Sequence, residues 1–70
     1  MNRIALWTDE SYARAGGYDV IAVCEDESGY FFYSGPWESL EDARAYVDEH
    51  NAARGISHED ALAILISSMR

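Results

Sequence analysis

The sequence carries one four-residue pattern twice: serine, any residue, glutamate and aspartate stand at 39–42 and again at 57–60. A serine side chain at such a place can accept a hydrogen bond from a backbone N–H of the first helical turn, and the acids oppose the positive end of the helix dipole. The pattern therefore predicts two helix starts. We expect helices near 40–54 and 58–69, the first of them closed by Gly55 in the left-handed cap conformation.

Three segments of the N-terminal half have strand character. Residues 18–25 are rich in β-branched side chains and apolar on both faces, so we expect them to form the central strand. Residues 30–34 follow an acidic, glycine-containing loop, which is a hairpin pattern, and Gly35 and Pro36 should end that strand. Residues 3–7 predict a further short strand, although their four consecutive apolar residues could equally begin a helix.

These elements together predict an α+β fold. We expect a two- or three-stranded antiparallel sheet, with strands near 3–7, 18–25 and 30–34, packed by the two C-terminal helices. Between the first two strands, residues 8–14 predict a helical turn or an ordered loop. A chain of 70 residues can bury only one core, so we expect residues 1–70 to form a single small acidic domain.

The charge of the chain excludes several kinds of partner. Thirteen acidic residues against five arginines give a net charge of −8, which repels phosphate backbones and anionic lipid surfaces. We therefore predict no direct nucleic-acid binding and no membrane association. The single cysteine, Cys24, cannot form an internal disulfide, and no apolar run approaches the length of a membrane span or a signal peptide. We expect a cytoplasmic protein.

Catalytic and metal-binding motifs are not evident in the sequence. The acids at 25–27 lack the alternating ligand spacing and central glycine of a calcium loop. His50, His58 and Cys24 lack zinc-site spacing, and Cys24 lies in an apolar run that would raise the pKa of its thiol rather than activate it. We therefore predict no enzymatic activity, no catalytic residue, no metal and no cofactor. A small metal-dependent enzyme or sensor is the third hypothesis.

The aromatic residues indicate an interaction surface. Two Trp, five Tyr and two Phe exceed what one small core can bury, because alternation along 30–33 places one pair of rings on the outer face of the sheet. The apolar side chains of the second helix also spread over about 200°, wider than the stripe of about 100° that one neighbour covers. Aromatic side chains are enriched at protein interfaces. We predict contact with a protein partner or self-association as a homodimer, unless the N-terminal segment folds over that face. The residues predicted for this surface are Trp37, Tyr30, Phe32, Ile64, Ile66 and Met69.

Residues 30–37, followed by residues 39–43, resemble the hairpin-to-helix arrangement of small accessory proteins from phages of GC-rich, actinobacterial-type bacteria. Most such proteins are uncharacterised, and many of those that are understood bind and redirect a host protein. The resemblance implies a non-catalytic regulator or inhibitor of a host protein. It assigns no role to any individual residue.

A second hypothesis uses the acidity of the chain. An acidic surface can imitate nucleic acid and block a DNA- or RNA-binding protein, as anti-restriction or anti-CRISPR proteins do. The net charge of −8 is below the roughly 16 phosphate charges on a duplex as long as this domain. Mimicry therefore requires the acids to form one continuous stripe. The residues predicted for this acidic surface are Glu25, Asp26, Glu27, Glu41, Asp48 and Glu49.

Overall fold

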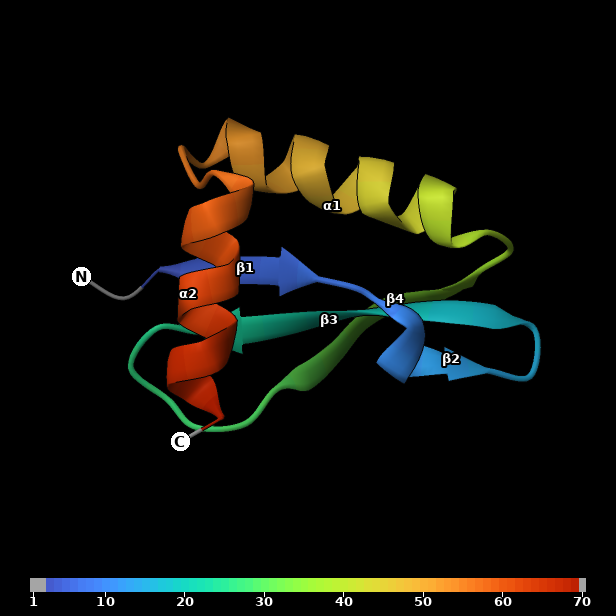
Figure 1. The fold of residues 1–70 in the computed structure, drawn as a ribbon, viewed down its shortest axis with the longest axis horizontal. Helices are drawn as coiled ribbons and strands as arrows, with labels where there is room; N and C mark the ends of the chain where they lie inside the picture. The colour runs from blue at the N-terminus through green and yellow to red at the C-terminus, as the bar shows by residue number, and fades with distance from the viewer. Residues whose placement is uncertain (1–2, 70) are drawn as a thin grey trace.

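The computed structural model describes residues 3–69 and confirms the α+β fold (Figure 1). A four-stranded antiparallel sheet is formed within residues 4–37 and packs against two C-terminal helices. The elements are β1 (Ile4–Trp7), the short 3-10 helix η1 (Glu10–Tyr12), β2 (Ala13–Arg14), β3 (Gly17–Cys24), β4 (Phe31–Trp37), α1 (Leu40–Ala53) and α2 (His58–Ser68). The two-residue strand β2 is the element that the sequence did not indicate.

Strand β3 is the central strand, as predicted. Ile21 and Ala22 pair with β1 and also with β4, and Tyr18 pairs with β2 and also with β4. Because a strand has only two edges, β1 and β2 share one edge of β3, and β4 lies alone along the other. Strand β4 is thus an outer strand of the sheet.

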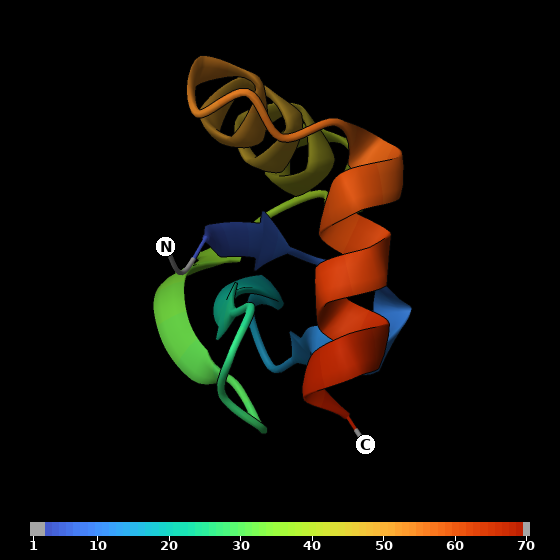
Figure 2. The same ribbon diagram turned by 90° about the vertical axis from the view of Figure 1, so that its left-hand side faces the viewer.

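The two helices cover opposite faces of the sheet. Side chains of a strand alternate between its faces, so Val20 and Ala22 of β3 join the core beneath α1, whereas Ile21 and Val23 join the core beneath α2. Figure 2 shows α2 along one face of the sheet and α1 lying crosswise to it, beyond β1. The sequence predicted one core, but the sheet divides the buried residues into two clusters. The cluster beneath α1 contains Leu6, Val20, Ala22, Ala43 and Val47, and the cluster beneath α2 contains Ala5, Ile21, Val23, Ile56, Ala61, Ile64 and Leu65.

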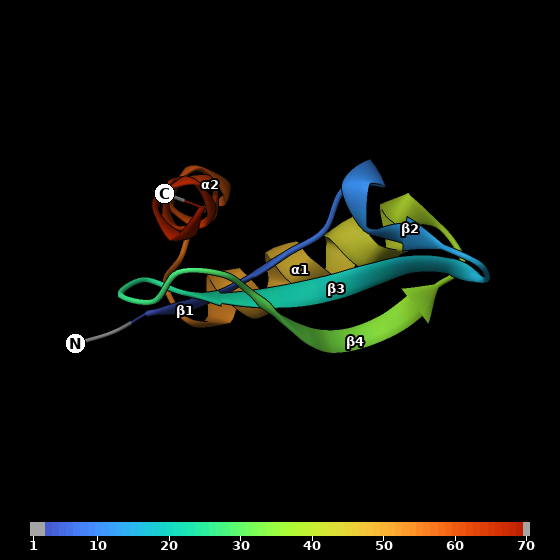
Figure 3. The ribbon, with the colours of Figure 1, turned by 90° about the horizontal axis from the view of Figure 1, so that it is seen from below.

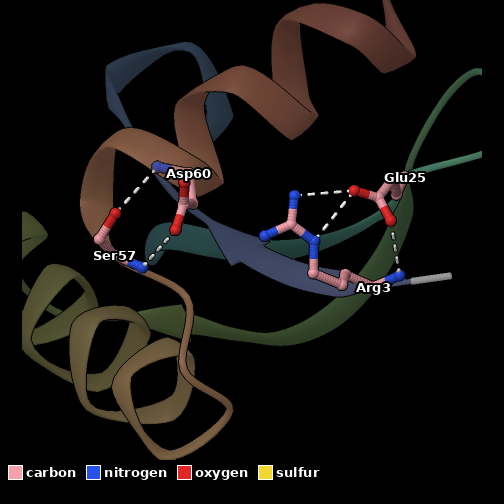
Figure 4. Close-up of polar contacts among 4 residues, drawn as sticks. All are labelled: Arg3, Glu25, Ser57 and Asp60. Atoms are coloured by element: carbon pink, nitrogen blue, oxygen red, sulfur yellow. Dashed lines mark hydrogen bonds and ion pairs between the residues drawn. The ribbon is translucent and has the colours of Figure 1, made fainter. Parts of the chain in front are cut away.

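Both serine caps form. The Ser39 hydroxyl accepts the backbone N–H of Asp42 at 3.0 Å, and the Ser57 hydroxyl accepts that of Asp60 at 3.1 Å. Only the second is reciprocal, because the Asp60 carboxylate also accepts the N–H of Ser57 (Figure 4). Gly55 ends α1 with a φ of +74°, the left-handed conformation that the sequence predicted.

A side chain of α1 completes the outer edge of β1. Asn51 is buried, its Oδ1 accepts the backbone N–H of Leu6 at 2.9 Å, and its Nδ2 donates to the carbonyl of Leu6 at 3.0 Å. The carboxamide thus provides the same pair of bonds that a neighbouring strand would provide. At Leu6, the edge of β1 has no free backbone group.

Strand β4 is longer than expected, because it continues through Gly35 and Pro36 to Trp37. A Cβ atom at position 35 would lie 2.8 Å from Oδ1 of Asp19, so glycine there lets β3 and β4 stay close. Pairing resumes beyond it between Trp37 and Tyr18, after a shift in register. The Gly-Pro pair therefore bends the strand and does not end it.

Candidate protein-binding surface

Four consecutive aromatic residues of the β3–β4 hairpin are exposed. The exposed fractions of Tyr30, Phe31, Phe32 and Tyr33 are 58%, 51%, 56% and 39%. Phe32 lies opposite Ile21 and so faces the side of α2, whereas Phe31 lies opposite Ala22 and faces the side of α1. Both pairs of rings are therefore exposed, where the sequence predicted exposure of one pair. Figure 3 shows the reason: β4 lies at the margin of the sheet, away from α2.

The outer edge of β4 is open along these aromatic residues. Within residues 3–69, β4 pairs with β3 alone. No charged residue occurs from 29 to 37, although natural edge strands are usually protected by charges, bulges or proline. The register shift after Phe32 and the proline at position 36 protect only the second half of the strand. Its first half is an uncharged aromatic edge with unpaired backbone groups.

Neighbouring side chains hold the rings that face the side of α2. The ring of Tyr12 meets that of Tyr30 edge-on, with centroids 5.4 Å apart. The guanidinium of Arg14 lies 6.0 Å from the centroid of the Phe32 ring, and its Nε donates to Oδ1 of Asp19 at 2.8 Å. These contacts orient Tyr30 and Phe32 in the unbound protein.

A second group of rings lies on the side of α1. Tyr33 approaches Tyr46 and His50, with centroids at 6.5 and 5.7 Å, and Trp37 lies 4.8 Å from Tyr46. Burial, and then the nearby Tyr33, raise the pKa of the Tyr46 hydroxyl. Trp37 is half-buried and donates from Nε1 to the hydroxyl of Ser34 at 2.9 Å. Its ring packs against Tyr46 and against the core beneath α1.

The residues at the C-terminal end of the chain that the sequence predicted for this surface differ in exposure. Ile66 and Met69 are exposed, together with Leu62, so part of the wide apolar face has no neighbour among residues 3–69. Ile64 is only 3% exposed and packs in the core beneath α2. A partner could not reach Ile64 in the folded domain.

A backbone hydrogen bond joins the hairpin to the end of α2. The N–H of Gly29 donates to the carbonyl of Ser68 at 2.8 Å. The residues that follow this bonded pair are Tyr30 and Met69, and Met69 is 71% exposed. We therefore define the aromatic edge as Tyr30, Phe31, Phe32 and Tyr33, with Met69 beside it.

The acidic residues are distributed over two elements. Residues 25–27 follow β3 in the loop joined to the end of α2, whereas Glu41, Asp48 and Glu49 lie on α1, which covers the other face of the sheet. Glu25 accepts two hydrogen bonds from the Arg3 guanidinium at 2.9 and 2.7 Å (Figure 4). This contact lowers the pKa of the Glu25 carboxyl and neutralises part of the acidic cluster.

An open groove of about 460 Å³ lies where β1 ends between the two helices. The Trp7 ring stacks against His58 with centroids 5.3 Å apart, and its Nε1 donates to the Asp9 carboxylate at 2.7 Å. The hydroxyl of Thr8 donates to the carbonyl of Asp19 at 2.8 Å. These donors are thus engaged within the fold. The lining residues are Trp7, Thr8, Arg44, Val47, Asp48, His58 and Leu62.

In the part of the chain that the structure describes, no three His, Cys, Asp or Glu side chains are grouped so that they could hold a metal ion. No helix within residues 3–69 is both long enough and apolar enough to cross a membrane. Comparisons with protein-family models, with curated proteins and with solved structures gave no match.

Proposed function

We propose that this chain is a non-catalytic protein-binding domain that regulates or inhibits its partner through the aromatic edge. The observation that carries the proposal is the run of four exposed rings on an unpaired, uncharged edge strand. The largest exposed apolar patch of a monomeric protein is often an interaction site. The phage-protein resemblance agrees with this function and stays a prediction.

The geometry favours binding by strand addition. An extended segment of a partner can pair with the free backbone groups of β4, and these main-chain bonds give affinity without requiring a particular sequence. Selectivity would come from the rings on either side of the added strand, since Phe31 and Phe32 face opposite sides of the sheet. The contacts from Tyr12 and Arg14 reduce the entropy lost when Tyr30 and Phe32 are covered.

A paired capture experiment tests the proposal. The bait is the native chain, Phe32→Lys, or Ala52→Lys, which places the same charge on the exposed surface of α1. The lysate comes from an actinobacterial cell, the type of host that the resemblance implies. We expect a captured protein that Phe32→Lys loses and Ala52→Lys retains, with all three baits equally folded by circular dichroism. Equal capture by all three would overturn the proposal.

Ionic strength separates this function from nucleic-acid mimicry. Burial of uncharged rings is insensitive to screening, whereas attraction between carboxylates and a basic groove weakens with salt. The division of the acids between α1 and a loop on the other side of the sheet favours the aromatic edge. We expect capture to survive a change from low to high salt. Loss of the partner in high salt would instead favour the mimic.

A further inference from the structure

We propose that the aromatic edge pairs with the same edge of a second copy, so that two sheets join through antiparallel β4 strands about a two-fold axis at Phe31. This inference rests on the proposed function, because it names a second copy of the chain as the occupant of that surface when no other partner is bound. Four observations support it: the register that symmetry allows, the area available, the state of the opposite edge and the distribution of charge.

Symmetry restricts the register of such a pair. A two-fold axis perpendicular to the sheet places each residue opposite one that points to the same face. With Phe31 on the axis, Phe31 meets its own copy, and Tyr30 of each chain lies opposite Phe32 of the other. These three central pairs are aromatic and precede the register shift that follows Phe32. A register centred on Phe32 would place Tyr30 opposite Ser34, beyond that shift.

The exposed area is sufficient for a small specific interface. A fully buried aromatic side chain removes about 150–250 Å² of surface from water. Because the four rings are about half exposed, one copy can bury roughly 400 Å² of ring surface and two copies roughly 800 Å². Met69 and the backbone of β4 lie beside the rings. They raise the total to about 1,000 Å², the size at which specific interfaces begin.

The opposite edge of the sheet limits the assembly to two copies. A sheet with two open edges can add copies without limit, whereas one with a single open edge stops at two. On the opposite edge, the backbone groups of Leu6 in β1 are already bonded to Asn51, and β2 is only two residues long, so this edge offers no continuous run of free backbone groups as long as that of β4. Strand β4 has no such capping side chain within residues 3–69. We therefore expect a dimer and no fibre.

The charge of the chain gives the dimer a distinctive salt dependence. Each copy carries a net charge of −8, so two copies repel each other, while the contacting segment from 29 to 37 is itself uncharged. Added salt screens the repulsion and leaves the apolar contact intact. The dimer should therefore become tighter at high ionic strength.

Sedimentation equilibrium tests the assembly with the native chain, at about 1 µM to about 1 mM, which brackets weak interfaces of this size. We expect the mass to rise from 7.9 kDa to twice that value, at lower concentration when salt is added. Phe32→Lys should remain monomeric throughout, and Ala52→Lys should dimerise as the native chain does. A native chain that stays at 7.9 kDa at every concentration would overturn the inference. If Phe32→Lys also lost a captured protein in that case, the proposed function would stand without the dimer.

A cysteine placed on the axis tests the register. Directly opposed residues of antiparallel strands have Cα atoms about 4.5–5.5 Å apart, within the range that a disulfide spans. In a Cys24→Ser background, Phe31→Cys should form a disulfide-linked dimer on mild oxidation. Ala15→Cys, an exposed position outside β4, should remain monomeric. A dimer that forms in solution but links both variants equally, or neither, would overturn the proposed pairing.

Discussion

Asn51 and Leu6 exchange two hydrogen bonds although 45 positions separate them in the chain, and both residues are almost completely buried. Oδ1 of Asn51 accepts the N–H of Leu6 at 2.9 Å, and Nδ2 donates to its carbonyl at 3.0 Å. The carboxamide closes the edge of β1 and fixes α1 to the sheet. The two edges of the sheet therefore differ: one is bonded to α1 at Leu6, and the other is open along its exposed aromatic residues.

Asn51→Ala should lower the free energy of unfolding by about 3 kcal/mol, because it leaves a buried donor and a buried acceptor of Leu6 without partners. Chemical denaturation followed by circular dichroism measures the loss. Glu49→Ala, at an exposed position of the same helix, is the control and should change stability by less than about 0.5 kcal/mol. An unfolding midpoint shared by both variants would show that Asn51 does not seal the edge.

Gly17→Ala should prevent folding or reduce stability by more than about 3 kcal/mol, since the new Cβ would lie 1.9 Å from the carbonyl oxygen of Trp37. Gly29→Ala provides a matched control, because its φ of +88° is also positive but no atom lies within 4 Å of the added Cβ. Its cost should be limited to the backbone conformation, about 1 kcal/mol. Thermal unfolding compares the two, and equal losses would mean that the approach of Trp37 is not the constraint.

The two serine caps should respond differently to mutation although their sequence pattern is the same. Ser57→Ala and Ser39→Ala should each reduce stability by about 1 kcal/mol. Ser57→Ala and Asp60→Ala together should cost less than the sum of the two changes, because the two residues form one reciprocal box. Ser39→Ala with Asp42→Ala should be nearly additive, since only one side-chain bond is present there. Double-mutant cycles measure both couplings, and equal values would contradict the difference between the caps.

The sequence predicted the helices well because the signals for their ends are local. Ser39, Ser57 and Gly55 each act on backbone groups within a few residues, so composition and spacing suffice to find them. Asn51 was missed as a structural residue because its partner lies in another element. Its position four residues after Val47, itself four after Ala43, is the signal that could have placed it on the buried face.

The exposed surface was predictable only in part. A surplus of aromatic residues indicates that some must be outside, but which rings are exposed depends on the position of their strand in the sheet. Because β4 is an outer strand, Phe31 and Phe32 are exposed on opposite faces. The same is true of Ile64 and Ile66 in α2, which both belong to one wide apolar arc. Ile64 is buried because it faces the sheet, and this orientation cannot be read from the arc alone.

Stability should fall in acid partly through Asp9. Burial raises the pKa of its carboxyl, but hydrogen bonds from the Trp7 indole and from Ser11 outweigh this effect, so the pKa lies below its ordinary value. A carboxyl whose pKa is lower in the folded than in the unfolded chain stabilises the fold above the unfolded value, near 3.9. That contribution disappears as the pH falls through the lower, folded value.

Trp7→Phe removes the indole donor and should therefore raise the pKa of Asp9, which NMR titration of the carboxyl carbon measures directly. The stability lost between neutral pH and about pH 2.5 should become smaller than in the native chain, since less of it depends on ionised Asp9. Trp37→Phe is the matched control: it removes the same kind of donor, but from Ser34, so the titration of Asp9 should be unchanged. If both variants moved the Asp9 titration equally, the hydrogen bond from Trp7 would not be the cause of the shift.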